Sequence, residues 1–217
     1  MNIEQARFNM IEQQIRPWDV LNLGVLELLA IVKREDFVPP EHRALAFVDT
    51  EVPLSGGQCM LAPKVEARLL QELDVRKHGR VLEIGAGSGY MAALLAHKAQ
   101  QVTSFEIDAA LARFASANLK RAGVTNANVI HADGAAGLPG DGPFDVIVLS
   151  GSVAEVPEAL LAQLKVGGRL IGIVGFEPVM RAVLVARTGD PGLERRVLFD
   201  TVAQRLQGFA EPTRFHF

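Results

Sequence analysis

A glycine-rich segment near residue 85 carries the clearest chemical signal in the sequence. The apolar run Arg80–Ile84 predicts a short strand, and a helical pattern begins at Tyr90. Glycines between a parallel strand and a helix let the backbone approach a ligand and adopt dihedral angles closed to other residues. We therefore predict that this turn lines a ligand site formed by Gly85, Ala86, Gly87, Ser88, Gly89 and Tyr90.

The spacing of these glycines separates two kinds of cofactor. A dinucleotide fingerprint requires G-x-G-x-x-G, but here Tyr90 stands where the third glycine would be. Glu83, just before the turn, would repel a pyrophosphate and attract a cation. A ligand with an ammonium group, a sulfonium and no phosphate fits better, and S-adenosylmethionine is that ligand. NAD is the weaker alternative.

Two more carboxylates follow the next two predicted strands. Glu106 ends a strand over 101–106, about 20 residues beyond the glycines, where a carboxylate can accept hydrogen bonds from ribose hydroxyls. Asp133, after a strand over 128–131, is placed to accept the adenine amino group, and Ile107 and Gly134 adjoin these two residues. One acidic residue at a strand end is usually only solvated, but one at each of three successive strands predicts a nucleoside site.

Several segments, in the same order, resemble the protein-L-isoaspartate O-methyltransferase family of class I methyltransferases. Val81–Tyr90 is similar to the family motif L-E-I-G-x-G-S-G-Y, and Asp133-Gly134, Pro143–Asp145 and Gly167–Leu170 resemble later family segments. The resemblance implies an enzyme that binds S-adenosylmethionine and methylates a carboxylate of isoaspartyl residues in damaged proteins. This is a protein-repair reaction that releases S-adenosylhomocysteine.

The substrate loop departs from the family pattern. The family carries G-Q-T-I-S-x-P before motif I, and its serine is thought to contact the substrate carboxyl, but this chain has Cys59 and Leu61 at the threonine and serine positions. Ser55, Ser150 or Ser152 could supply the missing hydroxyl. A different protein or small-molecule acceptor, or a cofactor-binding module without catalysis, therefore stays open. The candidate substrate-loop residues are Ser55, Gln58, Cys59 and Leu61.

The rest of the chain predicts the elements that would hold these residues. Apolar residues at helical spacing indicate helices over 3–15, 23–32, 64–73, 90–97, 109–121 and 157–164. Short apolar runs indicate strands over 80–84, 101–106, 128–131, 144–149, 168–174, 179–187 and 193–204. This alternation predicts an α/β, Rossmann-like fold with a mostly parallel sheet and helices on both faces. Residues 1–63 would form an N-terminal helical cap with the substrate loop, and residues 64–217 the cofactor domain, in one structural unit.

Composition excludes several other classes of protein. Lys and Arg number 22 against 25 Asp and Glu, a net charge of −3, which gives no bulk attraction to nucleic acid. The single cysteine cannot form an internal disulfide, and the five histidines share no metal-ligand spacing, so we expect no metal. The polar start and the lack of a long apolar run predict a cytoplasmic protein that does not enter the membrane. The oligomeric state is not predicted.

Overall fold

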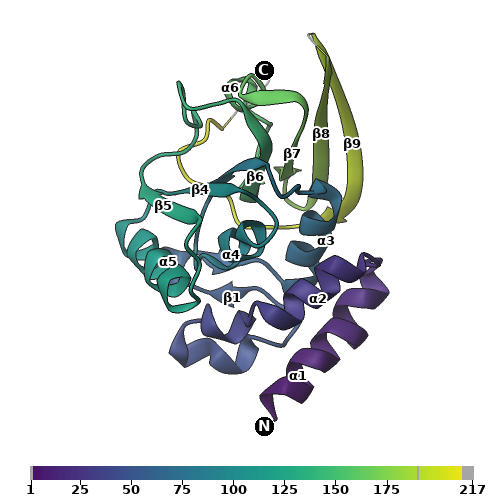
Figure 1. Ribbon diagram of the computed structural model, residues 1–217, viewed down its shortest axis with the longest axis vertical. Helices are drawn as coiled ribbons and strands as arrows, with labels where there is room; N and C mark the ends of the chain where they lie inside the picture. The colour runs from purple at the N-terminus through teal and green to yellow at the C-terminus, as the bar shows by residue number, and fades with distance from the viewer. Residues whose placement is uncertain (1, 190, 212–217) are drawn as a thin grey trace.

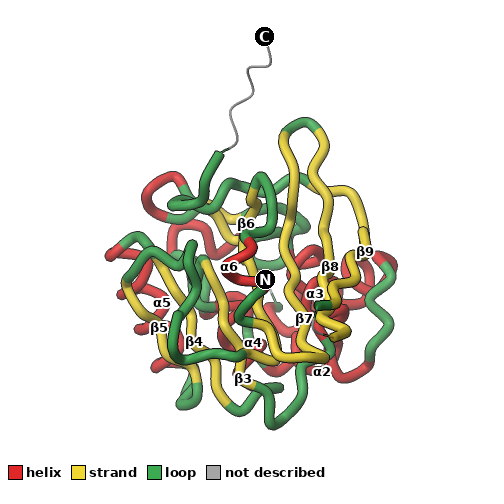
Figure 2. Tube along the Cα trace, turned by 90° about the horizontal axis from the view of Figure 1, so that it is seen from above, coloured by secondary structure: helices red, strands yellow, loops and turns green. Residues whose placement is uncertain are grey.

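The central element is a seven-stranded sheet with the strand order β5-β4-β3-β6-β7-β8-β9 (Figure 1). The computed structural model describes residues 2–189 and 191–211. In this spatial order, β5, β4, β3, β6 and β7 are parallel to one another. β8 runs antiparallel to β7, and β9 runs antiparallel to β8 (Figure 2). The predicted mostly parallel sheet is confirmed. The strands are β3 (Arg80–Ile84), β4 (Gln101–Glu106), β5 (Ala127–His131), β6 (Phe144–Val153), β7 (Leu164–Phe176), β8 (Val179–Gly189) and β9 (Gly192–Thr201).

Most helices agree with the predicted ranges. They are α1 (Ile3–Asn9), α2 (Leu23–Ile31), α3 (Pro63–Leu73), α4 (Tyr90–Ala96), α5 (Ala109–Arg121) and α6 (Glu158–Leu161). The helix predicted over 3–15 widens into a π-helical turn over Met10–Ile15. The helix predicted over 157–164 is shorter, because Leu164 pairs with Phe144 and already belongs to β7. A long-range strand pairing has overridden the local helical pattern there.

The helices cover the two faces of the sheet unequally. Side chains alternate along β6, so Val146 and Val148 join a core with α2 to α5, while Ile147 and Leu149 join the core of the opposite face. Within the described residues, α6 is the one α-helix on that second face, together with loops and the C-terminal segment, which contributes Leu206. Helices therefore lie on both faces as predicted, but five of the six α-helices in this part of the chain belong to one face.

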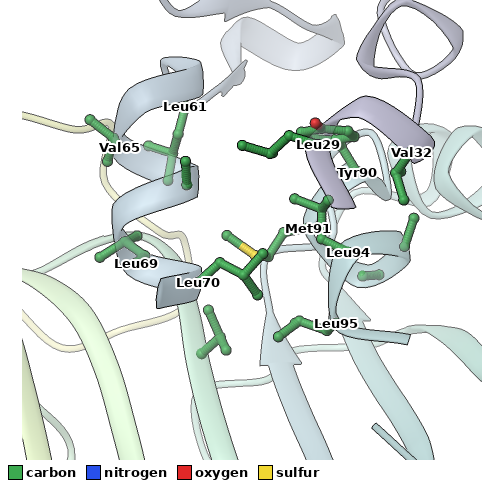
Figure 3. Packing of buried hydrophobic residues seen from close by; sticks show 14 of the residues in the cluster. Leu29, Val32, Leu61, Val65, Leu69, Leu70, Tyr90, Met91, Leu94 and Leu95 are labelled. Atoms are coloured by element: carbon green, nitrogen blue, oxygen red, sulfur yellow. The ribbon is translucent and has the colours of Figure 1, made fainter. Parts of the chain in front are cut away.

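The N-terminal segment shares its hydrophobic core with the cofactor half of the chain. Figure 3 shows Leu29 and Val32 of this segment beside α4, whose Met91 lies toward Leu70 in the second half of α3. No separate core divides the chain at residue 63 within the described residues, so the boundary predicted there stays a prediction.

Two buried ion pairs hold this N-terminal layer in place. Arg7 pairs with Glu35, and Arg34 pairs with Glu66 on α3. Arg34 is fully buried and also donates to the Leu61 carbonyl oxygen at 2.8 Å. Because losing one partner of such a pair leaves an uncompensated buried charge, Arg34 fixes the position at which the substrate loop enters α3.

Candidate active site

One cavity lies at the carboxyl ends of β3, β4 and β6, next to the point where the strand order reverses. Ligands bind at this position in open α/β sheets. The cavity measures about 490 Å³, including the space open to solvent. Residues predicted for the cofactor and for the substrate loop meet there: Gln58, Cys59, Gly85, Gly87, Glu106, Ile107 and Gly134.

The glycine turn folds against the end of β4. Gly85 and Gly87 have φ values of 92° and 53°, a region that favours glycine. The Gly85 amide donates to the Phe105 carbonyl at 2.8 Å, and the Gly87 amide donates to Glu106 Oε2 at 2.8 Å. The turn is therefore held by β4, with its backbone facing the cavity.

Glu106 is the carboxylate best placed to meet a ligand. It is 5% exposed and lines the cavity, and its Oε1 accepts from the Asp108 amide at 3.0 Å. Each carboxylate oxygen thus already accepts one backbone amide and keeps a lone pair. Glu106 can therefore accept further hydrogen bonds from a diol in the cavity without moving.

The loop after β5 forms the opposite end of the cavity. Gly134 lines it and lies so close to the sheet that a Cβ there would come within 2.8 Å of Ile84 Cγ2 and 2.9 Å of Phe105 Cβ. Asp133 is exposed at the rim, and its Oδ1 accepts from the Ala135 amide at 2.9 Å. Its predicted contact with adenine stays a prediction.

Glu83 lies beneath the turn and not in the open cavity. It is fully buried, and its two oxygens accept hydrogen bonds from Ser104 Oγ at 2.6 Å and Ser150 Oγ at 2.7 Å. Burial raises the pKa of Glu83 to about 7, against the opposing effect of these hydroxyl bonds. The sequence position of Glu83 predicts direct contact with a cofactor cation, and this contact stays a prediction. In the structure both oxygens of Glu83 already have protein partners.

A smaller inner pocket receives the rest of the turn. The predicted residues Glu83, Ala86, Ser88 and Tyr90 line it together with Leu61. Tyr90 is buried, with its ring 5.5 Å from that of Phe37 and its hydroxyl without a hydrogen-bond partner. Tyr90 therefore packs into the N-terminal layer and does not line the outer cavity.

Gly89 has a packing role. A Cβ at Gly89 would lie 3.1 Å from the carbonyl oxygen of Ala115, so this glycine lets α5 approach the start of α4. Gly89 lines neither pocket, although the sequence grouped it with the ligand turn.

The four substrate-loop candidates occupy different places in the structure. Gln58 and Cys59 line the outer cavity, and Leu61, 5% exposed, lines the inner pocket and packs in the core (Figure 3). Ser55 is exposed in the substrate loop and lines neither the outer cavity nor the inner pocket. Burial, with a smaller contribution from Glu51, raises the pKa of Cys59 to about 12, so its sulfur stays a neutral thiol.

The other two serines considered as replacements for the family hydroxyl, Ser150 and Ser152, also differ in their positions. Ser150 lines both pockets, with its hydroxyl donating to Glu83. Ser152 is fully buried, and its oxygen accepts from Arg205 at 3.4 Å. Only Ser150 is therefore placed to present a hydroxyl to a bound molecule.

Sequence reasoning missed several residues of the site. Ser104 holds Glu83, and Leu206 and Gln207 line the outer cavity from the end of the chain. Ser104 looks like an ordinary small residue within a strand, and the segment after β9 has no motif. Nothing in the sequence signals these residues, because only the fold brings them to the turn.

Among the described residues, no group of three or more His, Cys, Asp or Glu side chains is arranged to hold a metal ion. The helices found over that part of the chain are all too short or too polar to cross a membrane.

Comparison with known proteins places these features in one family context. Residues 6–202 match the profile described as protein-L-isoaspartate(D-aspartate) O-methyltransferase. A protein named protein-L-isoaspartate O-methyltransferase from Methanoculleus marisnigri is 41% identical over 186 residues, covering 85% of this chain and 84% of that protein. A protein of the same name from Rhodopseudomonas palustris is 40% identical over 192 residues, covering 88% of each.

Solved structures share the fold over almost the whole chain. A Plasmodium falciparum structure, described as a protein-L-isoaspartate O-methyltransferase in complex with S-adenosyl-L-homocysteine, superposes with a TM-score of 0.79. It is 23% identical, over 95% of this chain and 99% of that one. A second structure named protein-L-isoaspartate O-methyltransferase has a TM-score of 0.77 and 27% identity, over 91% of this chain and 64% of that one.

Proposed function

Because this chain belongs to the protein-L-isoaspartate(D-aspartate) O-methyltransferase family, we propose that it transfers a methyl group from S-adenosylmethionine to the carboxylate of isoaspartyl residues in damaged proteins. The observation that carries the proposal is the outer cavity, where the glycine turn and Glu106 face Gln58 and Cys59 of the substrate loop. We also propose that the enzyme is cytoplasmic, that its acceptor is a protein or peptide, and that it does not act on nucleic acid.

The cavity supports S-adenosylmethionine by its shape and charge. Gly85 and Gly134 line the cavity with backbone alone, and neighbouring protein atoms leave no room for a Cβ at either position. Glu106 offers free lone pairs to ribose hydroxyls, and among the described residues no lysine or arginine lines the cavity to hold a pyrophosphate. When bound, the cofactor supplies an electrophilic methyl group on a sulfonium.

The reaction asks little acid–base chemistry of the protein. The acceptor carboxylate is ionised at neutral pH, so no general base is needed. The work of the protein is to align the carboxylate with the methyl group and to exclude water. Gln58 offers the loop's amide donor at the cavity, and the Cys59 thiol, kept neutral by burial, forms part of the wall.

The loss of the family serine changes the acceptor side of the site. The Leu61 side chain is buried in the core, so no hydroxyl stands at that position. One missing hydrogen bond costs about 0.5–1.5 kcal/mol, which weakens orientation of the substrate but does not abolish transfer. The same observation favours the second candidate, methylation of a different protein or a small molecule.

The test compares two peptides that differ only in one linkage. The purified protein is incubated with tritiated S-adenosylmethionine and either an isoaspartyl peptide or the same peptide with a normal aspartyl residue. We expect base-labile methyl ester on the isoaspartyl peptide alone. Binding of S-adenosylhomocysteine without this ester would refute the isoaspartyl assignment, and labelling of another acceptor in a substrate screen would establish the second candidate.

A further inference from the structure

The chain after β9 returns to the cavity from outside the region that matches the family. The family match ends at residue 202. From the end of β9 the chain runs back across the sheet towards β4 and β5 (Figure 1). We name residues 204–208 the strap. Leu206 and Gln207 of the strap line the same cavity as the glycine turn and Glu106.

The middle of the strap lies directly on the glycine turn. A Cβ at Gly85 would come within 2.7 Å of Leu206 Cδ2, and one at Gly151 within 2.8 Å of the same atom. Backbone hydrogen bonds hold this position, from the Ser152 amide to the Gln204 carbonyl at 2.8 Å and from the Leu206 amide to the Ser152 carbonyl at 2.9 Å. Leu206 is thus pinned by β6 and covers the turn.

The far end of the strap covers the loop after β5. Gly208 has φ +86°, and a Cβ there would lie 2.6 Å from Asp133 Oδ1. The strap therefore reaches from the glycine turn to Asp133, the residue predicted to accept the adenine amino group.

The near end of the strap is tied to the substrate loop. The Gln204 side-chain amide donates to the carbonyl of Gly57, the residue before Gln58 of the outer cavity. The same few residues thus contact both the cofactor side and the acceptor side of the site.

From these contacts we propose that the strap is the outer wall of the cofactor site and must be displaced for the cofactor to enter or leave. The identity of the ligand rests on the proposed function, but the covering geometry does not. The strap acts through position. Leu206 packs on the turn, and backbone hydrogen bonds and the Gln204 side-chain amide hold the near end. Arg205 adds an ion pair with Glu211 and a hydrogen bond to the Gly175 carbonyl at 3.0 Å. A segment that must open before exchange slows association and dissociation together.

The test measures both rate constants for tritiated S-adenosylhomocysteine by rapid filtration. Leu206→Ala removes the side chain that covers the turn, and we expect association and dissociation each to accelerate by about tenfold. The equilibrium dissociation constant should change much less than either rate. The control is Leu198→Ala, because Leu198 is also half-buried but packs on β9 away from the cavity.

Two glycine variants test the displacement of the strap without removing the Leu206 side chain. Gly208→Ala places a methyl group against Asp133 and should lift the strap, which again accelerates exchange. Gly140→Ala is the matched control, because Gly140 has φ +88° and nothing within 4 Å of the added Cβ. It introduces the same backbone strain without touching the strap, so its exchange rates should equal those of the unmodified protein.

Two results would overturn the proposal. Unchanged rates in both Leu206→Ala and Gly208→Ala would show that exchange does not require the strap to move. A faster dissociation alone would show that Leu206 is a binding contact and not a cover. If the unmodified protein fails to bind S-adenosylhomocysteine at all, the proposed function fails instead, so the two failures are distinguishable.

Discussion

Replacing Glu83 by glutamine should flatten the dependence of folding stability on pH. Glu83 is fully buried between the hydroxyls of Ser104 and Ser150, and its pKa is about 7 in the folded protein, compared with an ordinary value of 4.5. The carboxyl group of the unfolded chain loses its proton first. Stability is therefore fully present below pH 4.5 and falls as the pH rises through 7.

The size of the effect follows from these two pKa values. At 1.36 kcal/mol per pH unit, the free energy of unfolding should fall by about 2–3 kcal/mol between pH 5 and pH 8.5 because of Glu83 alone. In Glu83→Gln the amide can accept from one serine hydroxyl and donate to the other, so the packing is kept. The variant should lack this fall and be more stable than the unmodified protein at pH 8.5.

Urea denaturation at several pH values measures the difference. Glu155→Gln is a suitable control, because Glu155 is exposed and its replacement changes no buried group. Parallel pH profiles of the Glu83→Gln variant and the unmodified protein would refute the reasoning, since they would show that Glu83 has the same proton affinity folded and unfolded.

Three further changes probe the cavity and its support. Glu106→Gln should weaken S-adenosylhomocysteine binding by about 1–3 kcal/mol in calorimetry, since one oxygen that anchors Gly87 becomes a donor; unchanged affinity would contradict the assigned ribose contact. Leu61→Ser should lower the free energy of unfolding by about 2–5 kcal/mol, because the side chain is buried; a fully stable variant would contradict this core position. Arg34→Met should cost about 3–5 kcal/mol by leaving Glu66 unpaired; a doubly substituted protein with Glu66→Leu should recover most of that loss.

The sequence predicted the cofactor half of the fold closely because local signals there are strong. The ranges of β3, β4 and α5 agree with their predicted ends, since short apolar runs and helical spacing both stop at glycine or acidic residues. The sequence left open the order of β8 and β9. Their place at the sheet edge follows from pairing with β7, which is a long-range property.

The candidate site also contains some features that the sequence predicts and others that only the structure places. Spacing alone grouped Gly85, Gly87 and Glu106 in one candidate site, and all three line the same cavity, because they follow strands whose carboxyl ends must meet at one edge. Spacing did not show that Glu83 lies under the turn or that Gly89 serves helix packing. Adjacent side chains on a strand point to opposite faces of the sheet, and side chains on a turn follow no fixed alternation, so only packing decides which of them faces a cavity.

The sequence by itself determined the fold class and the family, and it predicted the ligand turn and the carboxylates at the strand ends. The tertiary structure alone decided which residues share the cavity. It buried Leu61, separated Ser150 from Ser152, and brought the strap at 204–208 onto a turn more than a hundred residues earlier in the chain. The physical reason is that helix and strand periodicity depends on neighbouring residues. Contacts across the sheet form only when segments distant in the sequence cover the same apolar surface.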